Sequence, residues 1–236
     1  MLHICEKLPF TRLYATRGEK VHACSTGQLI IYMLGRIISC DRWMQIGAMN
    51  TPVDSLIELA KKTGAIKFGE FTLASGAKSN RYFEGKLLTL HPEGACRVGE
   101  TICDLLEGSG AQAVGGLILG AIPIATAVAV ISQCRGKPIP AFLVREAPKE
   151  HGTKKQIEGH LERGMQVAIV DDVVTRGGSI FKAIEAVENI GCKVVKVVAI
   201  VDRHEGGSDK LIADGYDFVP LIHFNTDGTV QANNLL

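Results

Sequence analysis

The 236-residue chain lacks the long apolar run that a membrane-spanning segment would require. A transmembrane helix needs roughly 18 or more consecutive apolar residues. The nearest candidate, LIIYMLGRII at residues 29–38, is short and contains Arg36. A signal peptide would place its apolar region nearer the start and follow it with a small-residue cleavage site, and neither is clear here. We therefore expect no membrane partner and a cytoplasmic location.

The chain also lacks a dominant charge of one sign and any closely paired cysteines. Lys and Arg number 26 against 25 Asp and Glu, so there is no global basic field of the kind that attracts nucleic acid. The seven cysteines are scattered and form no C-x-x-C pair, which suits a reducing compartment and small buried side chains. We expect small-molecule partners and no nucleic acid, and no residue is predicted to be a firm metal ligand.

Two common nucleotide-binding motifs are missing as well. The sequence contains neither G-x-x-x-x-G-K-[ST] nor G-x-G-x-x-G, so neither a P-loop nucleotidase nor a dinucleotide enzyme is supported. The hydrophobic fraction of 46% is nevertheless high enough for a sizeable core. The function must therefore be sought in another kind of motif.

The pattern of apolar and polar residues changes near Met49. Residues 1–48 show no clean helical or strand period, whereas TPVDSLIELAKKTGAI, starting at Thr51, predicts a capped amphipathic helix that ends at Gly64. We expect an amino-terminal extension over residues 1–48 and one domain over 49–236. Our hypothesis is that translation naturally begins near Met49, which intact-mass measurement of the natural protein would test.

Apolar strands and helices alternate through the rest of the chain. Continuous Val/Ile/Leu runs separated by helices of about a dozen residues are typical of a parallel sheet covered on both faces. The predicted class is therefore α/β, with a small irregular β region before the main sheet. The expected strands are 113–120, 139–146, 165–174 and 193–203, and the expected helices are 91–110, 122–136 and 179–191.

The most informative segment is VAIVDDVVTRGGSI, residues 167–180. Its strand would deliver Asp171 and Asp172 to the carboxyl end of the sheet, where ligands of open α/β sheets bind. The following loop, 175–179, offers hydroxyls, glycines and a helix amino terminus, which together suit one phosphate. Adjacent carboxylates are good acceptors for a ribose diol, so the segment indicates a sugar 5′-phosphate. The alternative is a pair of solvated acids before an ordinary glycine turn.

This segment resembles the diphosphoribosyl-pyrophosphate signature of type I phosphoribosyltransferases. The resemblance implies that family's fold, a central parallel sheet flanked by helices with a small amino-terminal hood. It also implies that the substrate is 5-phosphoribosyl 1-diphosphate (PRPP). The residues that it predicts to bind PRPP are Arg145, Lys149, His151, Asp171, Asp172, Val173, Val174, Thr175, Arg176, Gly177, Gly178 and Ser179.

A second segment, FTLASGAKSNRYFEGK at residues 71–86, resembles the hood of orotate phosphoribosyltransferases. By that resemblance Tyr82 and Phe83 would flank the pyrimidine ring. The alternative is that both are core aromatics. Many family members have a basic residue where this chain has Ala74, and Lys78 or Arg81 is the available substitute.

The charged segment VREAPKEHGTKKQIEG, residues 144–159, resembles the mobile catalytic loop of the same family. Its cations Arg145, Lys149 and His151 would close over the pyrophosphate leaving group. In the family this loop reaches into the partner subunit, which implies a homodimer. Glu146 stands where many members have a second lysine, and a merely solvated loop is the alternative.

Arg203 follows the last long apolar strand, in VDRHEGG. A guanidinium fork suits a planar carboxylate, and the resemblance places Arg203 on the carboxylate of orotate together with Thr175. A surface arginine at a strand end is the alternative. Residues 115–125 resemble the pyrophosphate loop, but Ala121 and Ile122 leave binding there to backbone amides.

Together the segments imply an orotate phosphoribosyltransferase of de novo pyrimidine biosynthesis, a glycosyltransferase. It would form orotidine 5′-monophosphate with Mg²⁺ bound mainly through substrate and water. The predicted catalytic residues are Lys149, Asp172 and His151. A purine phosphoribosyltransferase and a PRPP-sensing regulator that binds nucleic acid are the rival interpretations.

Overall fold

The structure, a computed structural model, describes residues 32–33, 36–37, 52–72, 78–147, 156–225 and 227–233. The chain divides into two compact units, Met1–Met49 and Asn50–Leu236. In the first unit, strands β1 (Tyr32–Met33) and β2 (Arg36–Ile37) pair antiparallel. The predicted extension otherwise lies outside the described residues, as does the hypothetical start at Met49.

The second unit is built around a seven-stranded sheet with the order β11–β10–β9–β8–β5–β6–β7. The five central strands run parallel, whereas β11 and β7 pair antiparallel at the two edges. Because β5, β8 and β9 are runs of apolar residues buried on both faces, they occupy the middle of the sheet. The strands are β5 (Ala113–Leu117), β6 (Ala141–Val144), β7 (Ile157–Gly159), β8 (Gln166–Val174), β9 (Lys193–Asp202), β10 (Phe218–Phe224) and β11 (Val230–Ala232).

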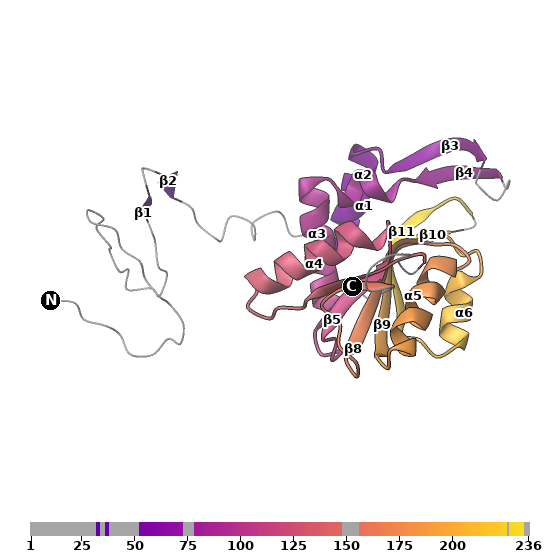
Figure 1. The fold of residues 1–236 in the computed structure, drawn as a ribbon. Helices are drawn as coiled ribbons and strands as arrows, with labels where there is room; N and C mark the ends of the chain where they lie inside the picture. Colours follow the sequence, from indigo (N-terminus) through magenta and orange to yellow (C-terminus); the bar gives the residue numbers. More distant parts are fainter. Residues whose placement is uncertain are drawn as a thin grey trace. The chain divides into compact units, whose positions relative to one another are not determined.

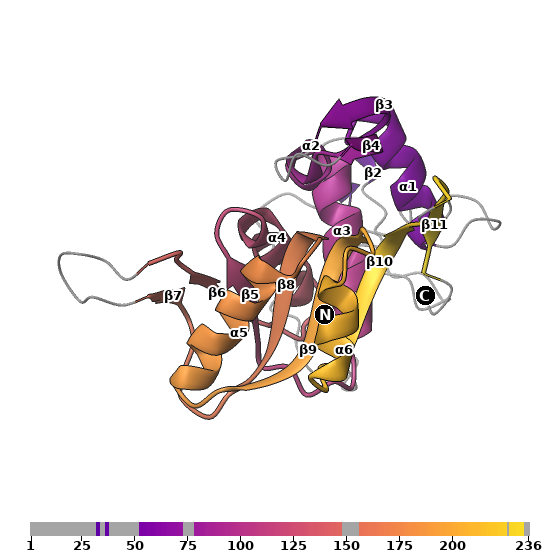
Figure 2. The ribbon, with the colours of Figure 1, turned by 90° about the vertical axis from the view of Figure 1, so that its right-hand side faces the viewer.

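Helices cover both faces of this sheet, which confirms the predicted α/β class. Helices α3 (Pro92–Leu106) and α4 (Ala121–Cys134) pack on one face, and α5 (Gly178–Asn189) and α6 (Gly207–Ala213) pack on the other (Figure 2). Alternate residues of β8 enter the two cores: Ala168 and Val170 join the α3–α4 side, and Val167 and Ile169 join the α5 side. Strand β8 therefore contributes side chains to two hydrophobic layers.

A smaller layer precedes the sheet in the chain. Strands β3 (Ile66–Thr72) and β4 (Lys78–Phe83) form an antiparallel hairpin with a register shift between Phe68 and Phe71. Helix α1 (Pro52–Lys62) precedes the hairpin and α2 (Gly85–Thr89) follows it, and the hairpin projects beyond both helices in Figure 1. We call β3, β4, α1 and α2 the hood. Its helices contact the main sheet, α2 at β8 and α1 at β10 and β11.

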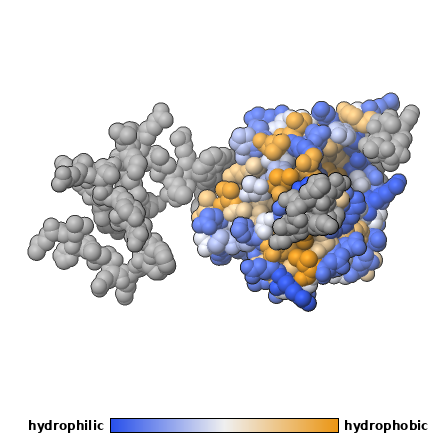
Figure 3. Space-filling view, in the orientation of Figure 1, coloured by the Kyte–Doolittle hydropathy of each residue, from blue (hydrophilic) through white to orange (hydrophobic). Residues whose placement is uncertain are grey.

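The outer surface mixes hydrophilic and hydrophobic residues. On the face seen in Figure 3, orange patches alternate with blue ones over the second unit. Among the described residues, Leu90, Leu119, Ile212 and Phe68 are the most exposed large apolar side chains. A search of the described residues finds no helix with the length and apolarity needed to traverse a lipid bilayer.

Candidate functional site

The predicted acid pair lies at the carboxyl end of β8. Asp171 is buried, with 6% of its surface exposed, and the half-buried Asp172 donates its backbone N–H to Oδ1 of Asp171 at 2.9 Å. Burial, with the neighbouring Asp172 charge as the second cause, raises the pKa of Asp171 to about 7. The fold therefore places a buried carboxyl group with a raised pKa at this sheet edge, a feature often found at sites that bind a polar ligand.

Lys86, which the sequence analysis did not single out, approaches the acid pair from the hood. Its Nζ lies 3.7 Å from Oδ2 of Asp172 and 4.0 Å from Oε1 of Glu84. Burial raises the pKa of Asp172, and the Lys86 charge opposes that rise. Helix α2 thus brings one cation to the two carboxylates, and the hood becomes part of the site.

Two glycines press directly against the acid pair. A Cβ atom on Gly120, in the loop between β5 and α4, would lie 2.4 Å from Oδ1 of Asp171. A Cβ atom on Gly85, at the start of α2, would lie 2.6 Å from Oδ2 of Asp172. Real Cβ atoms do not approach so closely, so a side chain at either position would displace the carboxylates. The loop predicted to bind pyrophosphate therefore lies against the carboxylates.

The loop after β8 is the segment predicted to bind a phosphate. Gly177 has φ of 79°, a left-handed conformation that favours glycine, and helix α5 begins at Gly178. Val174 is buried at the end of β8, Val173 and Thr175 are half-buried, and Arg176, Gly178 and Ser179 are exposed. The exposed residues stand at the positive end of the α5 dipole, where an anion is favoured.

Arg203 lies immediately beside this loop, at the end of β9. Its backbone N–H donates to the carbonyl of Val174 at 3.1 Å, and its guanidinium contacts Oε1 of Glu205 at 3.1 Å. The Arg203 side chain is only 15% exposed. The Arg203 guanidinium therefore already pairs with one carboxylate, the type of group that the sequence analysis expects it to bind.

The two loops that follow β8 and β9 are joined. Gly207 donates its N–H to the carbonyl of Thr175 at 2.9 Å, and a Cβ on Gly207 would lie 2.6 Å from the backbone N of Gly177. We call residues 175–179 the phosphate loop and 203–207 the arginine loop. Their backbones are in such close contact that neither can move far without the other.

The hood also contacts the end of β10. Arg81 on β4 donates to the carbonyl of Asn225 and lies over the Phe224 ring, 5.3 Å from its centroid. Burial, followed by the charge of Arg203, lowers the pKa of Arg81. The hydrogen bond and the ring contact show that Arg81 joins the hood to the end of β10.

The two predicted base-flanking aromatics lie in different environments. Tyr82 is 37% exposed, its ring lies 5.7 Å from that of Phe71, and its hydroxyl donates to Glu84 at 3.3 Å. Phe83 is 7% exposed and packs edge-on against Phe224 with ring centroids 6.2 Å apart. Because successive strand residues point to opposite faces, Phe83 belongs to the core. Only Tyr82 is kept as a candidate contact for a ligand.

The charged loop is described in part. Arg145 follows β6 at the same carboxyl edge, and its guanidinium lies 3.6 Å from Oε1 of Glu158. Glu146 accepts a hydrogen bond from Lys182 on α5 at 2.8 Å. Lys149 and His151 lie outside the described residues. Ala74 lies outside the described residues and the Lys78 side chain is not described, whereas the other predicted substitute, Arg81, contacts Asn225 and Phe224.

Fold and site together define a phosphoribosyltransferase domain, because the acid pair, the glycine-containing phosphate loop and the helix amino terminus meet at the carboxyl edge of a parallel sheet. Comparison with known proteins agrees: residues 102–227 match the family model described as "Phosphoribosyl transferase domain". A curated orotate phosphoribosyltransferase from Methanocaldococcus jannaschii is 45% identical over 167 residues, covering 71% of this chain and 92% of that protein. The chain therefore belongs to the orotate phosphoribosyltransferase family.

Solved structures show the same relationship. A crystal structure of Mycobacterium tuberculosis orotate phosphoribosyltransferase in complex with Fe(III) dicitrate matches with a TM-score of 0.65 and 34% identity, covering 73% of this chain and 97% of that chain. The same enzyme in complex with PRPP matches with a TM-score of 0.61 and 32% identity, covering 73% and 96%. The predicted fold is confirmed by these neighbours.

Proposed function

We propose that this chain transfers the phosphoribosyl group of PRPP to orotate, giving orotidine 5′-monophosphate and pyrophosphate in pyrimidine biosynthesis. The family relationship supports this activity. The observation that carries it is the contact between the two loops: the phosphate loop lies directly beside the arginine loop, so a phosphorylated sugar and a carboxylate-bearing base would meet at one sheet edge. A purine base has no carboxylate for Arg203 to bind.

The phosphate loop and the acid pair would hold the sugar. The amides and hydroxyls of Thr175–Ser179 suit the 5′-phosphate, and Val173 and Val174 set the path of the chain into that loop. Asp171 and Asp172 suit the ribose hydroxyls as acceptors. Gly120, which lies against both carboxylates, leaves room for backbone amides of its loop to face the pyrophosphate.

Orotate would bind between the arginine loop and the hood. Arg203 would bind the carboxylate. Thr175 lies close to Arg203, because the residue before it, Val174, accepts a hydrogen bond from the Arg203 backbone N–H. The exposed ring of Tyr82 would cover the base from β4. Phe83 would not contact the base itself but would hold β4 in place by packing on Phe224 in the core.

In the reaction, N1 of orotate attacks the anomeric carbon while the bond to pyrophosphate breaks. Positive charge develops on the ribose ring, and negative charge develops on the leaving group. Asp172 and its neighbour Asp171 would stabilise the positive charge on the ribose ring. The cations that would stabilise the leaving pyrophosphate are Lys149, His151 and Arg145. Exclusion of water would protect the activated sugar from hydrolysis.

The site residues also fit Mg²⁺. Carboxylate oxygens are the hard ligands that Mg²⁺ prefers, and two of them lie together here beside a single lysine. Asp171 and Asp172 would face the ion through water and substrate oxygens. When bound, Mg²⁺ would neutralise charge on the pyrophosphate.

We further propose a cytoplasmic homodimer in which the charged loop of one subunit, residues 144–159, reaches the site of the other. The support is the resemblance of that loop to the family's catalytic loop, which reaches into the partner subunit.

A spectrophotometric assay of orotate consumption tests the function. We expect loss of orotate absorbance that requires PRPP and Mg²⁺, with no competition by adenine or hypoxanthine. An Asp172→Asn variant, purified identically, controls for contaminating host enzyme. Consumption of a purine base with no consumption of orotate would replace the proposal with a purine phosphoribosyltransferase.

A further inference from the structure

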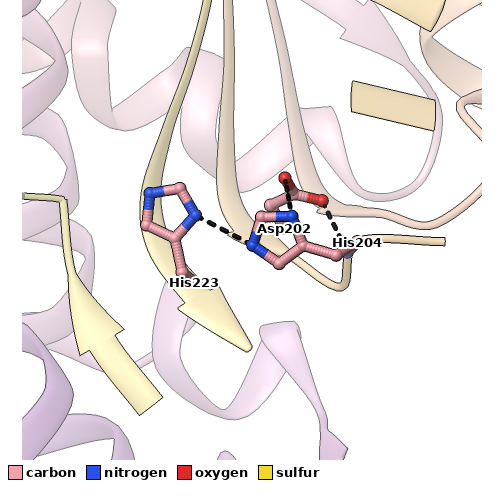
Figure 4. A group of neighbouring side chains, drawn as sticks. All are labelled: Asp202, His204 and His223. Atoms are coloured by element: carbon pink, nitrogen blue, oxygen red, sulfur yellow. Dashed lines mark hydrogen bonds and ion pairs between the residues drawn. The ribbon is translucent and has the colours of Figure 1, made fainter. Parts of the chain in front are cut away.

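A second cluster of polar side chains lies on β9 and β10, outside the acid pair and the phosphate loop. Asp202 ends β9 and is 1% exposed, His204 follows in the arginine loop, and His223 lies on β10. The parallel register sets His223 directly opposite Asp202. Figure 4 shows the two imidazole rings and the carboxylate in one row.

Asp202 holds His204 through two contacts. Its Oδ1 accepts the backbone N–H of His204 at 2.9 Å, and its Oδ2 lies 3.3 Å from Nδ1 of the same residue. His204 adopts φ of 52°, a left-handed conformation that is rare outside glycine. A carboxylate beside Nδ1 keeps the proton on that nitrogen, so the Nε2 lone pair is free to act as a ligand.

The two rings direct nitrogen atoms at each other. Nε2 of His204 and Nδ1 of His223 are 3.1 Å apart, while the ring centroids are 5.2 Å apart and the planes differ by 8°. Because the centroids are farther apart than the nitrogens, the facing nitrogens lie between the rings. Two metal–nitrogen bonds of about 2.0–2.1 Å meeting at a tetrahedral angle span about 3.3 Å, close to the 3.1 Å between these nitrogens. To chelate an ion, both rings would turn their nitrogen lone pairs toward a common point beside the line that joins them.

We propose that His204 and His223 bind one divalent transition-metal ion, with Asp202 orienting His204 from behind. Imidazole nitrogens select the zinc and nickel class of ions over Mg²⁺, so this site is chemically distinct from one formed by the acid pair. His204 is exposed, which gives an ion and its remaining water ligands access from solvent. The inference does not depend on the proposed transferase activity.

The ion would act as a cross-link between β9 and β10. It would join the arginine loop, which carries Arg203, to a strand of the sheet. Binding to the folded state alone raises apparent stability by mass action. Metal should therefore raise the melting temperature of the protein in a way that depends on both histidines.

Titration of the full chain with NiCl₂ by isothermal calorimetry, with any affinity tag removed, tests the site. Ni²⁺ is the probe because exposed thiols such as that of Cys134 compete more strongly for Zn²⁺. Other histidines can contribute background, so the measured quantity is the difference between wild type and the variants His204→Gln and His223→Gln. His160→Gln is the matched control, since His160 is exposed and distant in the chain.

We expect wild type and His160→Gln to share one site that each of the other two variants weakens by at least about tenfold. Only wild type and the control should gain melting temperature with Ni²⁺. Equal binding by wild type, His204→Gln and His223→Gln would overturn the proposal and leave the rings as a hydrogen-bonded pair. If a variant fails to fold, anomalous scattering from a wild-type crystal soaked in NiCl₂ decides, because the ion must appear between the two rings.

Discussion

Nζ of Lys86 lies 3.7 Å from Oδ2 of Asp172, which links the hood to the acid pair at the sheet edge. Its charge lowers the pKa of both Asp171 and Asp172 against the effect of burial. Lys86→Met should therefore raise both carboxyl pKa values and move the acidic limb of the pH–activity profile to higher pH. The measurement is kcat/KM against pH, with Lys61→Met on α1 as the control. An unchanged acidic limb would contradict the role of Lys86.

Asp171→Asn should make the protein more stable at high pH while it lowers the activity. The folded-state pKa of about 7 exceeds the ordinary value of 3.8, so the folded protein favours the protonated acid. Stability is therefore lost as the pH rises from about 4 through 7, and the loss is complete above 7. Since a shift of this size corresponds to on the order of 4 kcal/mol, the variant should gain most stability over wild type at pH 8 and least near pH 4.

Urea unfolding of wild type and Asp171→Asn at pH 5 and pH 8 measures this gain. The variant should also lose most of its activity, because the amide is a weaker acceptor for ribose hydroxyls. A gain that does not grow with pH would show that the carboxyl is not strained in the folded state.

Gly120→Ala should weaken PRPP binding. The new Cβ would meet Oδ1 of Asp171 at 2.4 Å and Oδ1 of Asp172 at 2.9 Å, so both carboxylates must shift. We expect a higher KM for PRPP. Gly136→Ala is the comparison: its Cβ meets nothing within 4 Å, but φ is 73°, so the variant should lose about 1 kcal/mol of stability and keep its KM unchanged. Equal KM values in the two variants would refute the argument.

Arg203→Ala should weaken orotate binding on the order of 10- to 100-fold and leave PRPP affinity nearly intact, because one charged hydrogen-bonding partner is removed. Arg203→Lys should recover little, since an ammonium lacks the planar fork. Separate calorimetric titrations with orotate and PRPP measure the two affinities. The exposed Arg163 provides the control variant, Arg163→Ala. A parallel loss for both ligands would assign Arg203 a structural role.

Mixed subunits test the shared loop. Lys149→Ala and Asp172→Asn should each inactivate the enzyme. If Lys149 serves the partner's site, a heterodimer of the two variants contains one intact site. Random mixing of the two should then restore about a quarter of wild-type activity, as expected for a twofold dimer. No recovery, with subunit exchange shown by native mass spectrometry, would exclude the shared arrangement.

The central sheet and its ligand edge could be predicted because their signal is local. The apolar run before Asp171 and the glycines after it lie within one segment, and a buried parallel strand followed by a helix has few other interpretations. Strand β10 was not predicted, since Pro220 interrupts its apolar run and proline usually argues against a central strand. The edge strands β7 and β11 are only three residues long, too short for an alternation of apolar and polar residues to be recognised.

The contacts that the sequence did not predict are formed by residues far apart in the chain, which meet only when the elements pack together. Lys86 meets Asp172 only because α2 packs on β8, and nothing near Lys86 in the sequence indicates that contact. Tyr82 and Phe83 form an aromatic pair in the sequence, but the pleat of β4 sends Phe83 to Phe224. His204 and His223 meet through the β9–β10 register, which pattern alone does not give.

The bond from Gly207 to Thr175 has a consequence for how such an enzyme can change. The two loops share backbone contacts that leave no room for a side chain at Gly207. A substitution in the arginine loop that changes the pocket for the base would therefore also move the phosphate loop. Preference for a new base would therefore have to arise elsewhere, for example at Tyr82, whose exposed ring can be replaced without disturbing that junction.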